Sequence, residues 1–247
     1  MATLAIIGGT GLSQMDGLKR TRREMIKTPY GAPSCPIIFG ELEGQSVAFL
    51  TRHGSTHVIP PHRINYCANI WALHSVGVRQ IIAVGAVGGI DDSCTTGALV
   101  IPDQIIDYTF GRENTFFNGA PDPVKNIDFS LPYDESLRRA LIDGAKTVSD
   151  VTLIDHGTYG ATQGPRLETA AEIRRMSQDG CSIVGMTGMP EAALARELEI
   201  AYACCAVVVN PAAGKSAEPI DVRSLSGAIE TGILAARQVI SLALGRL

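Results

Sequence analysis

The sequence predicts an α/β fold in which three layers form around a central mixed β-sheet flanked by helices. Two observations lead to this prediction. In the C-terminal half, short apolar runs typical of buried strands alternate with patterns of helical period. Glycine-rich or polar loops follow these runs, as they do at the carboxyl ends of parallel strands where ligands bind. No repeat or flexible linker divides the 247 residues, so we expect a single domain over residues 1–247.

The first half of the chain contains short apolar runs and one amphipathic pattern. The predicted elements there are strands over residues 4–8, 35–40, 45–51 and 80–84, and a helix from residue 64 to near Gly77. Glu43 and Gly44 are expected to form the turn of a hairpin between the second and third of these strands. Residues 112–132 are turn-rich and predict no regular element.

The second half alternates more regularly. The predicted helices span residues 137–145, 168–176 and 190–198, and the predicted strands span residues 151–154, 182–186 and 203–209. A C-terminal helix completes the fold, because its apolar residues recur at helical spacing and predict a buried stripe. The members of that stripe are Leu225, Ile229, Ile233, Ala236 and Ile240.

The composition excludes several classes of protein. Hydrophobic residues make up 45% and charged residues 19% of the chain, which argues against disorder. With 21 Lys and Arg against 25 Asp and Glu, the net charge is −4, so the basic excess of a nucleic-acid-binding protein is missing. The longest uncharged apolar run, residues 201–209, is far shorter than the ~20 residues that span a bilayer. Because no basic segment precedes an apolar one at the N-terminus, we expect a cytoplasmic protein with no membrane partner.

The six cysteines predict no redox or metal chemistry. No pair has the CxxC spacing, and Cys204 and Cys205 are neighbours in an apolar run. We therefore expect small buried side chains in a reducing compartment rather than a zinc site or a disulfide framework.

Two motifs near the N-terminus have residue types that bind anions. Residues 7–12 form a glycine turn after the first strand, where exposed backbone N–H groups and the Thr10 hydroxyl can hold an oxyanion; an ordinary tight turn is the alternative. Arg52 and His53 end another strand and pair a guanidinium with an imidazole, a combination suited to phosphate. A surface ion pair is one alternative. A metal site using His57 and His62 is another, disfavoured because two prolines prevent a helix there and no carboxylate is near.

Three further polar residues follow predicted strands or begin predicted helices. Glu168 lies at a predicted helix start, where it could serve only to complement the helix dipole. Thr187 could serve only as an N-cap, and Asn210 could serve only to start an Asn-Pro turn. Taken with the two anion-binding motifs, however, they place hydroxyl, cationic, carboxylate and amide groups at several strand ends. That set suits a phosphate together with a flat heterocycle.

The chain resembles the purine nucleoside phosphorylase and methylthioadenosine phosphorylase family over essentially its whole length. The resemblance is carried by IGGTGL at 7–12, RHG at 52–54, HRINYCANIWAL at 62–73, GAVGGI at 85–90, QGPRLET at 163–169 and GMTGMPEAALARE at 185–197. It implies a homotrimeric α/β enzyme that cleaves the N-glycosidic bond of a purine nucleoside. Inorganic phosphate would be the co-substrate, and neither a metal nor an organic cofactor would be required.

The resemblance also implies a role for each matching residue. The positions that match the phosphate pocket are Thr10, Arg52, His53, the backbone of Ala86, and Thr187. Met186 matches the residue beneath the ribose, and Glu168 and Asn210 match the positions that face the purine and act in catalysis. Two positions depart from the pattern. Gly85 stands where relatives often carry a polar side chain, and Asn126 stands where methylthioadenosine phosphorylases tend to have a histidine.

The matched residues also indicate which nucleoside would bind. An ionised Glu168 only accepts hydrogen bonds and so suits the N1–H of a 6-oxopurine, while the Asn210 amide can donate to N7. Methylthioadenosine phosphorylases typically carry Ser at the Glu168 position and Asp at the positions of Asn210 and Ala212. Inosine and guanosine phosphorylases typically hold the 5′-hydroxyl with a histidine after the Asn strand, but here apolar Ile220 and Val222 occupy that segment.

The combination predicts a hypoxanthine base on a 5′-methylthio sugar. Methylthioadenosine cleavage and inosine or guanosine cleavage remain alternatives of the same class. A purine-binding protein without catalytic activity is the alternative from another class.

Overall fold

The computed structural model describes residues 3–9, 17–119, 124–149, 151–221 and 225–247. The first half contains strands β1 (Leu4–Gly8), β2 (Lys19–Glu24), β3 (Ile37–Leu42), β4 (Gln45–Thr51) and β5 (Gln80–Gly89), with helix α1 (Tyr66–Ser75) before β5. The second half contains β6 (Leu99–Val100), β7 (Gln104–Asp107), α2 (Glu135–Ala145), β8 (Leu153–Ile154), β9 (Thr158–Ala161), α3 (Ala170–Gln178), β10 (Cys181–Gly185), α4 (Gly188–Glu197), β11 (Ala201–Pro211) and α5 (Leu225–Leu244).

The described strands form one mixed sheet, as the sequence predicts. The main path runs β2-β3-β4-β1-β5-β10-β9-β7, and β11 pairs with β5 and with β6. β5 lies at the centre, parallel to β1 and β11 and antiparallel to β10. The predicted hairpin is present as β3 and β4, which pair antiparallel on either side of Glu43 and Gly44.

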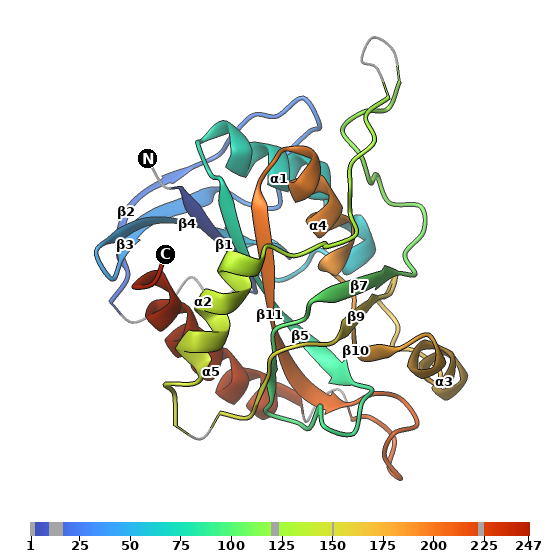
Figure 1. The fold of residues 1–247 in the computed structure, drawn as a ribbon. Coiled ribbons are helices and arrows are strands. Elements are labelled where there is room, and N and C mark those ends of the chain that lie inside the picture. Colours follow the sequence, from blue (N-terminus) through green and yellow to red (C-terminus); the bar gives the residue numbers. More distant parts are fainter. Residues whose placement is uncertain (1–2, 10–16, 120–123, 150, 222–224) are drawn as a thin grey trace.

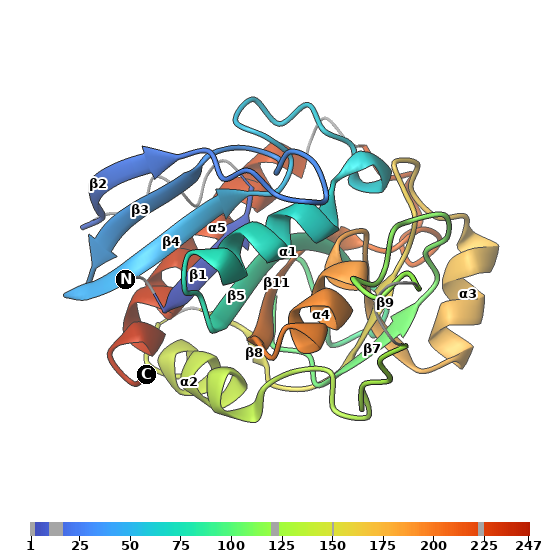
Figure 2. The ribbon, with the colours of Figure 1, turned by 90° about the horizontal axis from the view of Figure 1, so that it is seen from above.

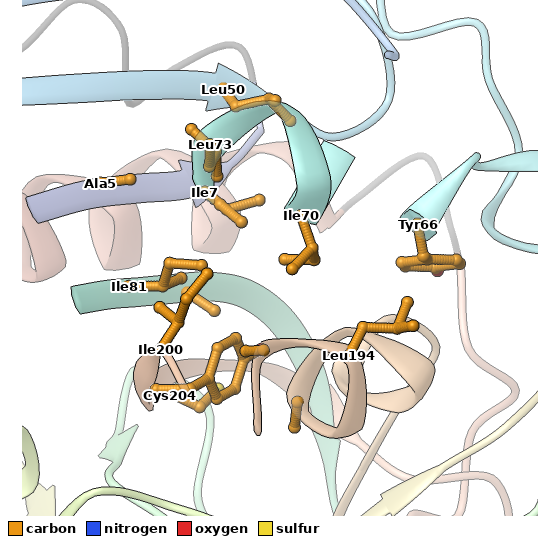
Figure 3. Packing of buried hydrophobic residues seen from close by; sticks show 14 of the residues in the cluster. Ala5, Ile7, Leu50, Tyr66, Ile70, Leu73, Ile81, Leu194, Ile200 and Cys204 are labelled. Atoms are coloured by element: carbon orange, nitrogen blue, oxygen red, sulfur yellow. The ribbon is translucent and has the colours of Figure 1, made fainter. Parts of the chain in front are cut away.

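Helices cover the two faces of the sheet (Figures 1 and 2). Strand β1 shows how alternation divides the core: Ala5 and Ile7 belong to the cluster on the α1 and α4 face, whereas Leu4 and Ile6 belong to the cluster under α2 and α5. Figure 3 shows part of the first cluster, with Ile7 of β1, Ile70 of α1 and Leu194 of α4. The three-layer architecture is therefore confirmed.

Helix α5 is long and apolar enough in composition to cross a bilayer. Its C-terminal part is instead buried against the sheet and α2, with Val239 and Ile240 fully inside the core. All six cysteines are buried with free thiols, as the sequence predicts.

The sequence did not predict several of the strands. β2 reads Lys-Arg-Thr-Arg-Arg-Glu and is exposed at every position, because it is an edge strand that pairs only with β3. β7 and β9 have four residues each, too few to show a clear period. The described parts of the turn-rich segment 112–132 contain no helix or strand, and they project from the body of the molecule (Figure 1).

Candidate active site

The site begins with a break in strand pairing on one side of β5. Along that side, β1 pairs with β5 only as far as Ala83, and β10 pairs with it at Gly88 and Gly89. Among the described strands, none pairs with residues 84–87 on this side, while β11 pairs along the other side. The Val84 carbonyl accepts a hydrogen bond from Arg52 across this gap. Since residues two apart in a strand point their backbone groups to the same side, the Ala86 amide faces the gap as well.

A cavity of about 320 Å³ opens at this gap. That volume is within the range of small-molecule sites. Its lining brings together every described residue that the sequence assigns to the site. They are Arg52, His53, Ala86, Glu168, Met186, Thr187, Asn210, Ala212 and Ile220. The two other predicted residues, Thr10 and Val222, lie outside the described residues.

Arg52 is held by a buried carboxylate that the sequence did not reveal. Its Nε and Nη2 donate to the two oxygens of Glu191 over 2.7 and 2.8 Å, and both side chains are almost fully buried. Burial alone would lower the pKa of Arg52, but the charge of Glu191 and its hydrogen bonds raise that pKa well above the ordinary value. The Nε and Nη2 donors of the guanidinium therefore bind Glu191 rather than a ligand. With the bond to Val84, three of its five N–H donors are used, and the other two are what Arg52 can offer to phosphate.

His53 contributes a neutral ring rather than a second cation. Its Nδ1 lies 2.8 Å from the carbonyl oxygen of Ile59, an acceptor, so this nitrogen carries the proton. Burial, together with the nearby charges of Arg52 and His57, lowers the pKa of His53 to about 4. At neutral pH, Nε2 is therefore a hydrogen-bond acceptor. It can accept a hydrogen bond from the P–OH group of a hydrogen phosphate.

Glu168 does not act as a helix cap. Helix α3 begins two residues later, with Thr169 as its N-cap and Glu172 completing a capping box. The predicted start at residue 168 was wrong because the capping-box glutamate is Glu172 and not Glu168. The Glu168 carboxylate instead accepts a hydrogen bond of 2.6 Å from the Thr162 hydroxyl and lines the cavity.

Thr187 and Asn210 also differ from their simple structural interpretations. Thr187 occupies the N-cap position of α4, but its side chain makes no capping hydrogen bond. Asn210 does not start a turn: β11 continues to Pro211, and a bulge between Val208 and Asn210 shifts the register with β5. One N–H of the Asn210 amide donates to the Pro211 carbonyl. The second N–H and the amide oxygen are the groups it can offer to a ligand.

The departure at Gly85 leaves the cavity open at that point. A Cβ atom added to Gly85 would meet only the Thr187 hydroxyl, at 3.6 Å. The backbone of β5 is therefore accessible here, and any contact from this position is a main-chain contact. Asn126, the other departure, is an exposed residue of the projecting segment.

Another part of the lining, here called the apolar wall, is apolar and comes mainly from α5. Leu225, Ile229 and Ile233 line the cavity beside Ile220. The sequence assigned these three α5 residues to a buried stripe, and that assignment was wrong: Ile229 is 37% exposed, and Leu225 and Ile233 are only partly buried. Their helical spacing could not distinguish a side chain covered by the core from one that faces a cavity.

The cavity therefore combines a polar wall with an apolar one. The open edge of β5, two Arg52 donors and the Thr187 hydroxyl suit a phosphate, whose charge is favoured by a preorganised set of donors. Glu168 and Asn210 present an acceptor and a donor that suit a polar heterocycle. Within the described part of the chain, no group of three or more His, Cys, Asp and Glu side chains is placed to hold a metal ion.

This fold and the composition of this cavity suit an α/β enzyme that acts on an oxyanion and a heterocyclic compound. The Phosphorylase superfamily matches residues 3–244, so the chain belongs to that superfamily. It is an enzyme of the purine nucleoside phosphorylase type, which is a class of pentosyltransferase.

Individual relatives agree with this assignment. Over 233 residues, the chain is 53% identical to a protein of Pseudomonas syringae pv. tomato named probable S-methyl-5′-thioinosine phosphorylase, covering 94% of each chain. It is 47% identical over 225 residues to the 6-oxopurine nucleoside phosphorylase of Pyrococcus furiosus, covering 89% of this chain and 83% of the relative. A solved methylthioadenosine phosphorylase from an antarctic soil metagenomic library superposes with a TM-score of 0.92 at 39% identity, covering 99% of this chain and 85% of the other.

Proposed function

We propose that the enzyme cleaves S-methyl-5′-thioinosine with inorganic phosphate, releasing hypoxanthine and 5-methylthioribose 1-phosphate. The observation that carries this proposal is the pairing, within one cavity, of Glu168 and Asn210 with an apolar wall at Ile220 and Ile229. Glu168 and Asn210 form hydrogen bonds with the base, and the apolar wall packs against the 5′ substituent of the sugar. Hypoxanthine would enter purine salvage, and 5-methylthioribose 1-phosphate would enter methionine salvage.

Hydrogen-bond complementarity supports the choice of base. Thr162 donates to one oxygen of Glu168, so the carboxylate keeps acceptor capacity for the N1–H of a 6-oxopurine. A 6-aminopurine would place its N1 acceptor against this carboxylate. A mismatch of that kind reduces catalytic efficiency by roughly 10⁴-fold.

The apolar wall supports the choice of sugar. A 5′-hydroxyl against Ile220, Leu225 and Ile229 would lose its hydrogen bonds to water without gaining a partner there, whereas a methylthio group gains from burial. Among the relatives, the name of the Pseudomonas protein agrees with this substrate. The Pyrococcus protein, named for 6-oxopurine nucleosides in general, makes inosine or guanosine cleavage the second candidate.

In the proposed reaction, the residues act mainly by placing charge. The sugar develops oxocarbenium character as the glycosidic bond breaks, and a phosphate held at the open edge of β5 supplies both the nucleophile and the countercharge. In this proposal, Arg52, Thr187 and the Ala86 amide hold the phosphate, and Met186, which lines the same cavity, contacts the ribose. Asn210 donates to N7 as negative charge develops on the leaving purine. The proposal requires neither a covalent enzyme intermediate nor a cofactor.

We also propose that the enzyme is a cytoplasmic homotrimer. The projecting segment and its flanks carry large apolar side chains in solvent, since Phe110, Val124 and Leu131 are each at least 70% exposed. Exposed apolar groups gathered on one segment are typical of an interaction surface. Light scattering coupled to size-exclusion chromatography tests this assembly, and a mass of one chain would contradict it.

The function is tested by incubating the enzyme with methylthioinosine, methylthioadenosine, inosine or guanosine, with and without phosphate, while following base release. Methylthioinosine should be cleaved only with phosphate. It should exceed inosine in kcat/KM by roughly 30- to 1,000-fold, because burial of the methylthio group and the unpaired hydroxyl together amount to about 2–4 kcal/mol. Equal efficiency with inosine would contradict the sugar assignment. No release of base from any of the four nucleosides in the presence of phosphate would contradict catalysis.

A further inference from the structure

Arg112 lies outside the predicted site but contacts the two loops that carry it. Its guanidinium donates to six oxygen atoms. On one side these are the carbonyls of Thr162 and Gln163 and the Gln163 side-chain oxygen, at 3.1, 2.8 and 3.0 Å. On the other side they are the carbonyls of Met186 and Met189, at 2.9 and 2.6 Å. The sixth is the hydroxyl of buried Tyr66.

Arg112 therefore joins a base loop, residues 162–168, to a sugar loop, residues 186–189. The base loop ends at Glu168, and the sugar loop contains Met186 and Thr187, so their separation sets the distance between the purine-reading carboxylate and the ribose and phosphate sites. These loops come from different strands, β9 and β10. The pairing of the two strands positions the loops only at their starts.

The chemistry of these contacts suits a clamp. All six acceptors are neutral oxygens, and the positive charge of the guanidinium strengthens these hydrogen bonds. Nη1 has two N–H groups for three acceptors, so one of its N–H groups is shared. Five N–H donors in a planar fork can serve loops on both sides at once, whereas the single ammonium group of a lysine cannot. The Tyr66 ring also lies under the guanidinium, with its centroid 5.3 Å from the Arg112 Cζ.

A short chain of hydrogen bonds connects Arg112 to Glu168. Arg112 donates to the Thr162 carbonyl, and the Thr162 hydroxyl donates to the Glu168 carboxylate over 2.6 Å. Movement of residue 162 would thus move the carboxylate that reads N1. Arg112 itself does not line the cavity.

We propose that Arg112 is a positioning residue for base recognition, which holds Glu168 at the correct distance from the ribose site through Thr162. This inference deepens the proposed function and rests on it. It assigns part of the selection of 6-oxopurines to a side chain that does not touch the substrate.

The test compares Arg112→Lys with Arg138→Lys. Arg138 is a matched control because it is buried on α2, donates to the backbone carbonyls of Pro102 and Asp155, and does not line the cavity. We expect Arg112→Lys to lower kcat/KM for methylthioinosine by about 10²-fold, as a displacement of about 1 Å does. It should lower the preference for methylthioinosine over methylthioadenosine at least about tenfold, since that preference depends on hydrogen bonding by Glu168. In Arg138→Lys the preference should remain that of the wild type.

Thr162→Val provides a second measurement that leaves Arg112 in place. It should reduce the same preference, and combining it with Arg112→Lys should add little, because the two residues act along one chain. An unchanged preference in Arg112→Lys, or equal losses in both arginine variants, would overturn the inference. If Arg112→Lys fails to fold by circular dichroism, an unchanged preference in Thr162→Val overturns it instead. Failure of the proposed function would appear separately, in the choice of substrate by the wild-type enzyme.

Discussion

The polar and apolar walls of the cavity are built in different ways. On the polar wall, Arg52 is almost fully buried and held by Glu191, and Glu168 is held by Thr162. On the apolar wall, Ile229 and its neighbours on α5 are partly exposed, and their aliphatic side chains cannot form hydrogen bonds. Substitutions on the polar wall should therefore alter charge balance or stability together with activity. Substitutions on the apolar wall should alter selectivity with little loss of stability.

The largest effect is expected for the two residues that read the base. The double variant Glu168→Ser with Asn210→Asp should shift preference from methylthioinosine toward methylthioadenosine by about 10³–10⁴-fold, because both positions would then match a 6-aminopurine. The measurement is the ratio of kcat/KM for the two nucleosides at saturating phosphate. An unchanged ratio would show that these residues do not read the base.

Arg52 should show how strongly the polar wall couples activity to stability. Arg52→Ala leaves the fully buried carboxylate of Glu191 without its cation, which lowers the free energy of unfolding by about 3–5 kcal/mol. It should also raise the KM for phosphate far more than the KM for the nucleoside. Urea unfolding and steady-state kinetics measure the two effects.

The control for this prediction is Arg139→Ala, which breaks an exposed ion pair with Glu135 on α2. Its effect on the free energy of unfolding should stay below about 1 kcal/mol. Equal KM changes for phosphate and nucleoside in Arg52→Ala would mean that Arg52 has a structural role only.

The two walls also differ in how far the sequence could predict them. Arg52 follows β4, Glu168 lies in the loop after β9, and Asn210 is the penultimate residue of β11. Because strand ends gather at the edges of a sheet, their convergence was predictable. The role of Glu191 was not predictable. An acidic residue in the first turn of a helix is favoured by the helix dipole alone, so its position gave no sign of a buried ion pair. Arg112 lies in a turn-rich segment and bonds mostly to carbonyls, which have no sequence signature.

Helix α5 shows the same limit for apolar residues. Its period of 3.6 correctly predicted one apolar face. The face is covered by the core at Ala236 and Ile240 but opens onto the cavity at Ile229 and Ile233. What lies opposite a face depends on tertiary structure, which the period does not encode.

A comparison within that face tests the apolar wall directly. Ile229→Ala should lower the preference for methylthioinosine over inosine by about 1–2 kcal/mol, the transfer energy of the removed carbons, and leave stability nearly unchanged. Ile240→Ala should do the reverse, lowering the free energy of unfolding by about 2–5 kcal/mol while the preference is retained. Ile220→His should also narrow the preference, by giving the hydroxyl a partner. A preference that survives Ile229→Ala and Ile220→His would place the 5′ substituent elsewhere.

The smallest effect concerns His53 and the pH dependence of stability. Its pKa in the folded protein is about 4, against an ordinary value of 6.5. Between these values the unfolded chain binds a proton that the folded chain does not bind. Stability is therefore complete above about pH 6.5 and falls as the pH drops toward 4. Because the ring is partly exposed and solvent screens it, the expected loss is about 1–2 kcal/mol.

His53→Asn keeps a donor for the Ile59 carbonyl but cannot titrate, so its stability should fall less over this range. The measurement is urea unfolding of both proteins at several pH values between 7.5 and 4.5. Carboxylates, and His74, whose pKa burial also lowers, titrate in both proteins and cancel in the difference. A difference that grows as the pH falls would confirm that folding lowers the pKa of His53 and that the ring is neutral in the folded enzyme at neutral pH. Parallel curves would mean that folding does not shift the pKa of His53. A wild-type stability that falls less than that of His53→Asn would mean that the folded site raises this pKa, and the polar wall would then hold phosphate with two cations.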